Sequence, residues 1–190
     1  MHAIANRKGK CGVRKKNTMR VLFGIVFGFI AAATILAQTR ESAEANLKRK
    51  NITLPAPPSA IGKYVPAVRS GNLLFLSGHG PRPFEPMGKV GKDLSLDQGY
   101  QAARATGLNL LATVRATLGS LDKVKRIVKV LGMVNSAPGF TDQPKVINGF
   151  SDLMIEVFGD KTGAHARSAV GVAELPGNIP VEIEMVLEVE

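Results

Sequence analysis

Two stretches of this 190-residue chain place apolar residues at helical spacing on one side only. The first, residues 95–119, opens with the capping-box sequence Ser95-Leu96-Asp97-Gln98, repeats small or apolar residues every three to four positions and ends at Gly119. The second, residues 146–157, repeats apolar residues in the same way and is followed by Gly159. A helix with a single apolar stripe has to bury it against another element. We therefore expect two helices that lie on one face of a β-sheet.

The sheet is predicted from five segments with β-type patterns. They are residues 64–69, 73–77, 124–134, 168–173 and 181–190. The first two are separated by Ser70-Gly71-Asn72 and favour a hairpin. In the last segment apolar residues alternate with Glu182, Glu184 and Glu188, which turns these glutamates away from the core. The resulting order, β-β-α-β-α-β-β, predicts a two-layer α+β domain.

A separate feature precedes this domain, because residues 21–39 contain no charged side chain. As a helix they would extend about 28 Å, close to the ~30 Å hydrocarbon core of a bilayer. Two interpretations fit this segment. It is either a transmembrane anchor that places residues 41–190 outside the cytoplasm, or a signal peptide cleaved after Ala37, which leaves the domain periplasmic or secreted. If the segment does not act as a leader, the protein stays in the cytoplasm.

The net charge of +10 is concentrated in the N-terminal part of the chain. Eight of the 25 Lys and Arg residues and none of the 15 acidic residues lie in residues 1–40, which leaves a net +2 for the rest. We therefore expect no nucleic-acid partner. The chain divides into a basic tail (1–20), the transmembrane or signal segment (21–39), a Pro-rich linker (40–58) in which residues 41–50 fit a short polar helix, and the globular domain (59–190).

Few residues of the domain could carry out chemistry. No phosphate-binding loop, dinucleotide fingerprint or metal-ligand spacing occurs, and the single Cys11 lies outside the domain. Arg167 could form a bidentate pair with a small carboxylate, because small residues alternate on its side of the strand and leave space for a ligand or a neighbouring subunit. Glu182 could activate a water, and Tyr64 and Ser77 could bind a ligand through their hydroxyl groups. Each of these residues also fits a purely structural role.

Several separated motifs are similar to those of the RidA/YjgF family. The N-terminal ones are Ala60-Ile61-Gly62-Lys63-Tyr64 and Gly71-Asn72-Leu73-Leu74-Phe75-Leu76-Ser77-Gly78. The C-terminal ones are Ala166-Arg167-Ser168-Ala169-Val170, Glu174-Leu175-Pro176 and Val181-Glu182-Ile183-Glu184. The resemblance covers about residues 52–190, with the motifs in the right order and spacing, and leaves the N-terminal 40 residues outside it.

The resemblance implies a chorismate-mutase-like fold assembled as a homotrimer, with sites in clefts between subunits. It implies hydrolysis of reactive enamine or imine intermediates of amino-acid metabolism to 2-keto acids and ammonia, without a cofactor or a metal. Carried over by position, Arg167 would hold the carboxylate of the substrate and Glu182 would act on the hydrolytic water. Tyr64, Ser77 and Gly78 would line the pocket, with Gly78 bringing backbone close to the ligand.

Some positions depart from the pattern of the family. Lys63, His79 and His165 stand where family members often have Pro, Gln and Pro, and Ala169 stands where Cys is frequent. Lys63 and His79 would add cations beside the pocket. These departures keep two other functions open. One is a non-catalytic trimer that binds small carboxylates or other metabolites, and the other, which fits the balanced charge of the domain less well, is a ribonuclease.

Overall fold

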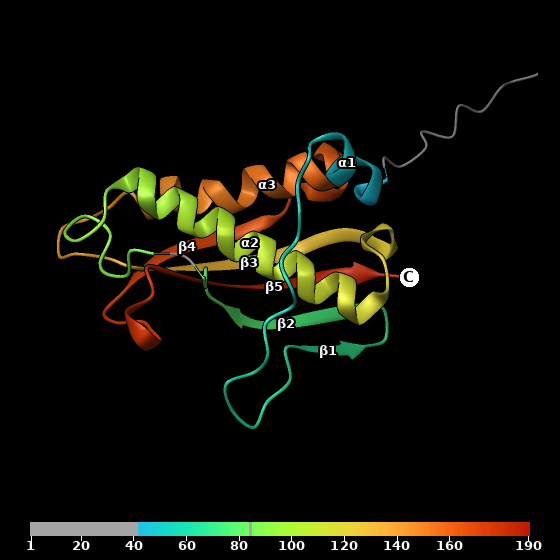
Figure 1. Ribbon diagram of the computed structural model, residues 1–190, viewed down its shortest axis with the longest axis horizontal. Coiled ribbons are helices and arrows are strands. Elements are labelled where there is room, and N and C mark those ends of the chain that lie inside the picture. The colour runs from blue at the N-terminus through green and yellow to red at the C-terminus, as the bar shows by residue number, and fades with distance from the viewer. Residues whose placement is uncertain (1–41, 84) are drawn as a thin grey trace, which may run out of the picture. The chain divides into compact units, whose positions relative to one another are not determined.

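The computed structural model describes residues 42–83 and 85–190, which belong to one compact unit. Its elements are α1 (Ala43–Arg49), β1 (Ala67–Ser70), β2 (Leu73–His79), α2 (Leu96–Leu118), β3 (Val124–Asn135), α3 (Gln143–Gly163), β4 (Ala166–Val172) and β5 (Val181–Val189), with short 3-10 turns η1 (Leu121–Lys123) and η2 (Pro176–Asn178). Figure 1 shows α2 and α3 lying side by side on one face of the sheet. The predicted α+β domain with its helices on one face is confirmed.

The five strands form one sheet in the order β1-β2-β5-β3-β4. All neighbours are antiparallel except β3 and β4, which run parallel. A parallel pair needs a crossover, and α3 supplies it. The last strand therefore inserts into the middle of the sheet, between β2 and β3, and its residues reach both halves of the molecule.

The helix α2 has the two ends that its sequence predicts. The Ser95 side chain accepts a hydrogen bond from the Gln98 N–H while the Gln98 side chain caps the Ser95 N–H, and Gly119 ends the helix in the left-handed conformation at φ 83°. In α3, Gly159 interrupts the helical conformation at φ 71° and ψ 169°, and one more turn continues to Gly163. Gly159 is therefore a break, as predicted, but not the last residue of the element.

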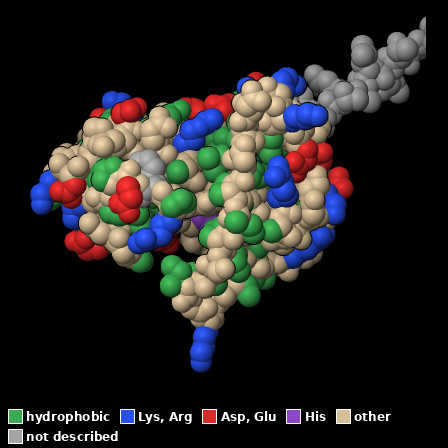
Figure 2. Space-filling model, viewed as in Figure 1, with side chains coloured by type: hydrophobic (Ala, Val, Ile, Leu, Met, Phe, Trp, Pro, Cys, Tyr) green, Lys and Arg blue, Asp and Glu red, His purple; other side chains and the backbone are tan. Residues whose placement is uncertain are grey.

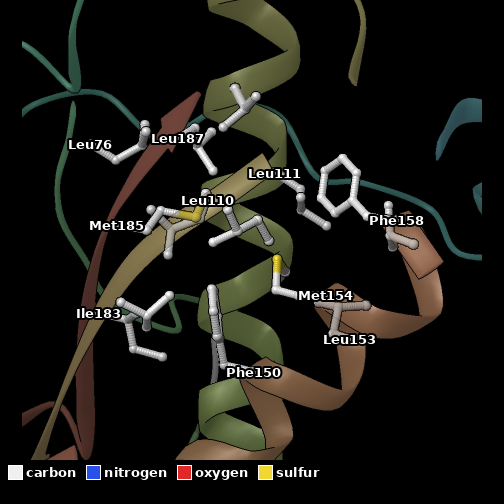
Figure 3. Close-up of a cluster of buried hydrophobic side chains, with 14 of the residues drawn as sticks. Leu76, Leu110, Leu111, Phe150, Leu153, Met154, Phe158, Ile183, Met185 and Leu187 are labelled. Carbon is white, nitrogen blue, oxygen red and sulfur yellow. The ribbon is translucent and has the colours of Figure 1, made fainter. Parts of the chain in front are cut away.

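The hydrophobic core lies between the sheet and the paired helices (Figure 3). Its largest fully buried side chains include Leu74, Leu110, Leu111, Ile127, Ile147, Phe150, Leu153, Met154, Ile183, Met185 and Leu187. The two helices approach closely at Gly149, where a Cβ atom would lie 2.1 Å from the backbone oxygen of Tyr100. This contact holds α2 and α3 at a fixed distance over the sheet.

Helix α1 belongs to the same core. Ala43 and Leu47 are buried, the buried Asn46 side chain donates to the carbonyl of Val157 in α3, and Glu44 pairs with Arg115 of α2. The short polar helix expected within residues 41–50 is thus present, and it packs on the domain. After it, an extended segment crosses over α2 toward β1 (Figure 1), with Ile52 and Leu54 packed on the core.

The first strand is shorter than expected and the second is longer. The predicted segment 64–69 becomes a strand only from Ala67, because Pro66 has no backbone N–H to continue the ladder. The segment predicted to end at Ser77 runs on to His79, with an irregularity between Leu76 and His79 in its pairing with β5. This irregularity forms one wall of the site described below.

Membrane insertion was predicted for residues 21–39, which lie outside the described residues. Within residues 42–83 and 85–190 there is no helix with the length and apolar character needed to cross a bilayer.

Candidate functional site

A cavity of about 770 Å³ opens where the end of β2 meets the start of β5. It is lined by Pro58, Ser59, Ala60, Ile61, Gly62, Tyr64, Pro66, Gly78, His79, Gly80, Arg82, Asn109, Pro176, Gly177, Ile179 and Glu182. Figure 2 shows this face hollowed beside the extended segment that crosses it, with histidine surface inside the hollow. The lining is mainly apolar, with a few polar groups, which is the composition of a small-molecule site.

Glu182 supplies the carboxylate of the cavity. Its neighbours Val181 and Ile183 are buried under the helices, so alternation along β5 turns Glu182 to the opposite side of the sheet. The side chain lies over Gly78, where a Cβ atom would be only 2.1 Å from the Glu182 carboxylate oxygen Oε1. Burial raises the pKa of Glu182 above its ordinary value, and the negative charge of Glu184 raises it further. A carboxyl group of this kind is suited to take up and return a proton.

Tyr64 lies in the loop before β1, and Ser77 lies in β2 where that loop contacts the strand. Tyr64 is 49% exposed and lines the cavity, and its hydroxyl oxygen accepts a long hydrogen bond of 3.5 Å from the Ile61 N–H. Ser77 does not line the cavity, because its hydroxyl donates to the carbonyl of Val65 at 2.8 Å. Ser77 thus fixes the loop that carries Tyr64.

His79 lies at the bottom of the cavity. Its Nδ1 lies 2.7 Å from the carbonyl oxygen of Ser77, so Nδ1 carries a hydrogen, and Nε2 lies 2.8 Å from the Thr113 hydroxyl oxygen. Burial lowers the pKa of His79, against the smaller opposing effect of the bond to Ser77. Burial therefore opposes the positive charge that was expected on His79. Lys63 is exposed and is not a lining residue.

Arg167 is held elsewhere on the molecule, at the edge strand β4. Its Nη1 donates to the Asn148 side-chain oxygen at 3.0 Å and to the Ser151 hydroxyl at 2.8 Å, both on α3. Ser151 in turn lies 3.0 Å from Nε2 of His165, whose Nδ1 donates to the carbonyl of Gly163. Burial lowers the pKa of His165, and the positive charge of Arg167 adds to the effect. Asn148 and Ser151 together orient the guanidinium, and His165 holds Ser151 in place.

Arg167 and Glu182 face opposite sides of the sheet within one chain. Arg167 is level with Val130 and Met185, which point into the core under the helices, whereas Glu182 points away from them. The two residues are also separated by strand β3 and by three positions along β5, a Cα separation on the order of 14 Å. The structure therefore brings Tyr64, Gly78 and Glu182 together but leaves Arg167 outside their cavity.

The space expected beside Arg167 is partly filled by the chain itself. A Cβ atom at Gly171 would lie 2.7 Å from the Gln143 side chain and 2.9 Å from the Ser136 hydroxyl oxygen. The small residues of β4 therefore accommodate the start of α3. Beside them remains a second hollow of about 450 Å³, in which Lys89 is already bound by Asn135, Glu174 and the carbonyl of Ala173.

The described residues offer no ready-made metal site. Within residues 42–83 and 85–190 no three His, Cys, Asp or Glu side chains gather around one point.

Sequence reasoning missed residues whose role depends on tertiary contacts. Asn109 is buried in α2, and its side-chain amide donates to the carbonyls of Gly80 and Arg82 at the edge of the cavity. Asn148 and Ser151, which hold Arg167, are spaced three apart beside the apolar stripe of α3. The sequence did contain signals for these residues, namely an Asn within the apolar pattern of α2 and a polar pair three positions apart in α3.

Comparison with known proteins adds a family to this geometry. Residues 54–189 match the family model described as Endoribonuclease L-PSP. The chain is 45% identical over 147 residues to Protein TCP17 of Trypanosoma cruzi, covering 76% of this chain and 92% of that protein. It is 34% identical over 147 residues to a 2-iminobutanoate/2-iminopropanoate deaminase of Dermatophagoides farinae, covering 75% of this chain and 98% of that protein.

The fold agrees with a solved structure as well. The chain superposes on the crystal structure of the protein Atu1372 from Agrobacterium tumefaciens with a TM-score of 0.69 and 42% identity, covering 78% of this chain and 92% of the other.

Proposed function

Because the chain belongs to the Endoribonuclease L-PSP family, also called RidA/YjgF, we propose that it hydrolyses reactive enamine or imine intermediates to 2-keto acids and ammonia. The observation that carries the proposal is the partly buried Glu182 carboxyl, which lies over Gly78 in a mainly apolar cavity and has a raised pKa. The relative named as a deaminase of this type supports the reaction class.

The chemistry needs little more than positioning and one proton acceptor. A water attacks the imine carbon, the electron pair of the C=N bond moves to nitrogen, and the water proton passes to the Glu182 carboxylate. Glu182 passes this proton to the nitrogen, which gives the neutral carbinolamine. Glu182 then carries the carbinolamine hydroxyl proton to the same nitrogen, the C–N bond breaks, ammonia leaves and the hydroxyl oxygen becomes the keto oxygen. The Tyr64 hydroxyl, half exposed at the entrance, is placed to hydrogen-bond the substrate.

We propose that the carboxylate next to the imine carbon is held by Arg167 of a neighbouring copy in a homotrimer. The guanidinium is oriented by Asn148 and Ser151 and is not a lining residue in its own chain. The sheet face opposite the helices offers a surface for the copies to meet, since Val68, Phe75 and Val170 are 54%, 43% and 42% exposed on it. In a symmetric ring each site would join Arg167 of one copy to Glu182 of the next.

The uncharged segment 21–39 supports a proposal about location. We infer that it anchors the domain to a membrane or exports it, with residues 41–190 on the side away from the basic tail. Fractionation of the full chain beside a variant in which two residues of the segment are replaced by Arg tests this. Loss of the protein from the membrane or exported fraction only in the Arg variant is expected, and equal distribution of both contradicts it.

Glu182→Gln tests the reaction directly, with 2-iminobutanoate as substrate and release of the 2-keto acid as the readout. We expect the catalysed rate to fall by roughly 10²-fold or more, because a positioned acid–base group contributes about that much. Binding of the product 2-oxobutanoate should persist, because Arg167 is untouched. An unchanged rate in Glu182→Gln would refute the assigned role.

Two other functions would give different results in these assays. A non-catalytic carboxylate-binding trimer would bind 2-oxobutanoate and show no enhanced hydrolysis in the unmodified chain. The family description names an endoribonuclease, so the protein should also be incubated with single-stranded RNA over a series of salt concentrations. Cleavage that is abolished by Glu182→Gln would favour the ribonuclease over the deaminase.

A further inference from the structure

One cation lines the cavity that contains Glu182, and it has no part in the reaction outlined above. Arg82 follows β2 by three residues, and among the lining residues that the structure describes it is the only Lys or Arg. Its backbone is fixed, because the buried Asn109 amide donates to the carbonyls of Gly80 and Arg82 at 2.9 and 2.8 Å. The backbone from which the Arg82 side chain extends is therefore held by the core at the edge of the cavity.

The Arg82 side chain reaches across to the other wall. Its Nη2 lies over η2, so close that a Cβ atom at Gly177 would be 2.9 Å away. Gly177 also has a positive φ of 64°, a conformation that favours glycine. The turn thus presents bare backbone where the guanidinium lies. A side chain at that position would push the cation out of the cavity.

The charge of Arg82 has no acidic partner within residues 42–83 and 85–190. The ion pairs of that part of the chain engage Lys89, Arg104, Arg115 and Lys145. Glu182 in the same cavity does not neutralise it either, since burial and Glu184 account for the raised pKa of Glu182 and no cation lowers it. The cavity is therefore lined by the Glu182 carboxyl group and by the unpaired Arg82 guanidinium, with space between the two groups.

The size of the cavity fits a ligand that bridges these two groups. A 2-imino acid with only a methyl or ethyl side chain fills a small part of about 770 Å³. The apolar walls, Ile61 and Ile179 among them, can pack against methylene groups that lead from the imine carbon toward Arg82. A guanidinium at the end of such a path forms bidentate hydrogen bonds with a carboxylate.

Resting on the proposed function, we propose that Arg82 selects 2-imino acids that carry a second acidic group on the side chain. The imine carbon lies at Glu182, the carboxylate next to that carbon is held from the neighbouring copy by Arg167, and the side-chain carboxylate binds Arg82. Arg82 is a specificity residue in this arrangement, because it touches the substrate and takes no part in the proton transfers.

The test compares two imines that differ only in the terminal group. Oxidation of glutamate and of norvaline by amino-acid oxidases, with catalase present, generates 2-iminoglutarate and 2-iminopentanoate, which end in a carboxylate and a methyl group. The full chain should hydrolyse the first with a kcat/KM about 10- to 100-fold higher, the range expected for one charge-assisted hydrogen-bonded pair. Arg82→Gln should remove most of this preference and leave the kcat/KM for 2-iminopentanoate unchanged.

Two control variants test how the preference for 2-iminoglutarate depends on the charge of Arg82. Arg82→Lys keeps the charge but not the planar fork, and it should retain part of the preference. Lys92→Gln removes one exposed positive charge outside the cavity and should leave the preference unchanged. Equal kcat/KM for the two imines in the unmodified chain overturns the inference. An equal loss for both imines in Arg82→Gln also overturns it, because Arg82 would then hold the carboxylate common to both.

Binding of the stable products separates this inference from the proposed reaction. Calorimetry with 2-oxoglutarate and 2-oxopentanoate needs no turnover, and tighter binding of 2-oxoglutarate that depends on Arg82 supports the inference even if neither imine is hydrolysed. Hydrolysis of both imines with no Arg82-dependent difference in rate or binding leaves the deaminase function standing and refutes the role of Arg82.

Discussion

At Gly78 the absence of a side chain determines where the Glu182 carboxylate lies. The carboxylate occupies the space that a Cβ atom would take, which places it against the backbone of β2 and inside the cavity. Alternation in the sequence predicts that Glu182 faces away from the core, and the structure confirms this direction. Its partial burial was not predictable, because the wall formed by residues 58–62 has no periodic pattern to read.

Gly78→Ala should therefore displace the Glu182 carboxylate. We expect hydrolysis to fall by roughly 10²-fold, since small displacements of a catalytic group cost about that much, and we expect unfolding to require less denaturant. The added Cβ has no carboxylate to meet in a Glu182→Ala background, so the loss of stability should be much smaller there. Chemical denaturation of the four proteins measures this coupling. Equal destabilisation in both backgrounds would show that the carboxylate does not occupy this space.

The raised pKa of Glu182 predicts a pH dependence of the rate and of stability. A general base must be deprotonated, so the rate should fall on the acid side with a midpoint above the ordinary Glu pKa of 4.5. Burial is the larger cause and Glu184 the smaller, so Glu184→Gln should move the midpoint down, but only part of the way. An unmoved midpoint in the pH profile of kcat/KM would exclude Glu184 as a cause.

The sign of the stability effect follows from the same shift. The fold disfavours the charged form of Glu182, so its contribution to stability is fully present below the unfolded pKa and is lost as the pH rises through the higher folded value. Glu182→Gln should remove this loss. Denaturation curves of both proteins below and above the acid midpoint would show it.

Among the elements, those with strong periodicity were predicted best. Helix α2 was predicted to within a residue at each end, because its capping box and Gly119 are local signals. The pairing of β5 between β2 and β3 has no local signal, since it brings together segments far apart in the sequence. For the same reason the sequence could not show that Arg167 and Glu182 face opposite sides of the sheet.

Helix α1 gives a prediction at this scale. Leu47 is 3% exposed and packs in the core, so Leu47→Ala in the full chain should lower the free energy of unfolding by about 2–4 kcal/mol. Lys48→Ala on the exposed side of the same helix is the matched control and should change it little. Urea denaturation measures both. Similar small effects would mean that α1 does not stabilise the domain.

At the scale of the whole molecule, Arg167 lies outside the cavity that contains Glu182 within one chain. Residues 54–189 match one family model and cover the complete sheet and both long helices, so the resemblance found in the sequence motifs extends over the entire domain. The motifs predicted the family and placed Tyr64, Gly78 and Glu182 in one pocket, but they could not show that Ser77 and Arg167 lie outside it. The account therefore requires that a second copy completes each site.

Mixing two inactive variants tests this requirement most directly. Arg167→Ala keeps Glu182, and Glu182→Gln keeps Arg167, so neither protein alone should hydrolyse 2-iminobutanoate. Coexpressed in equal amounts, the two chains should form mixed trimers in which about a quarter of the sites join an intact Arg167 to an intact Glu182 across an interface. The account predicts recovery of about a quarter of the normal activity in the mixture. No recovery in trimers shown to contain both chains would contradict it.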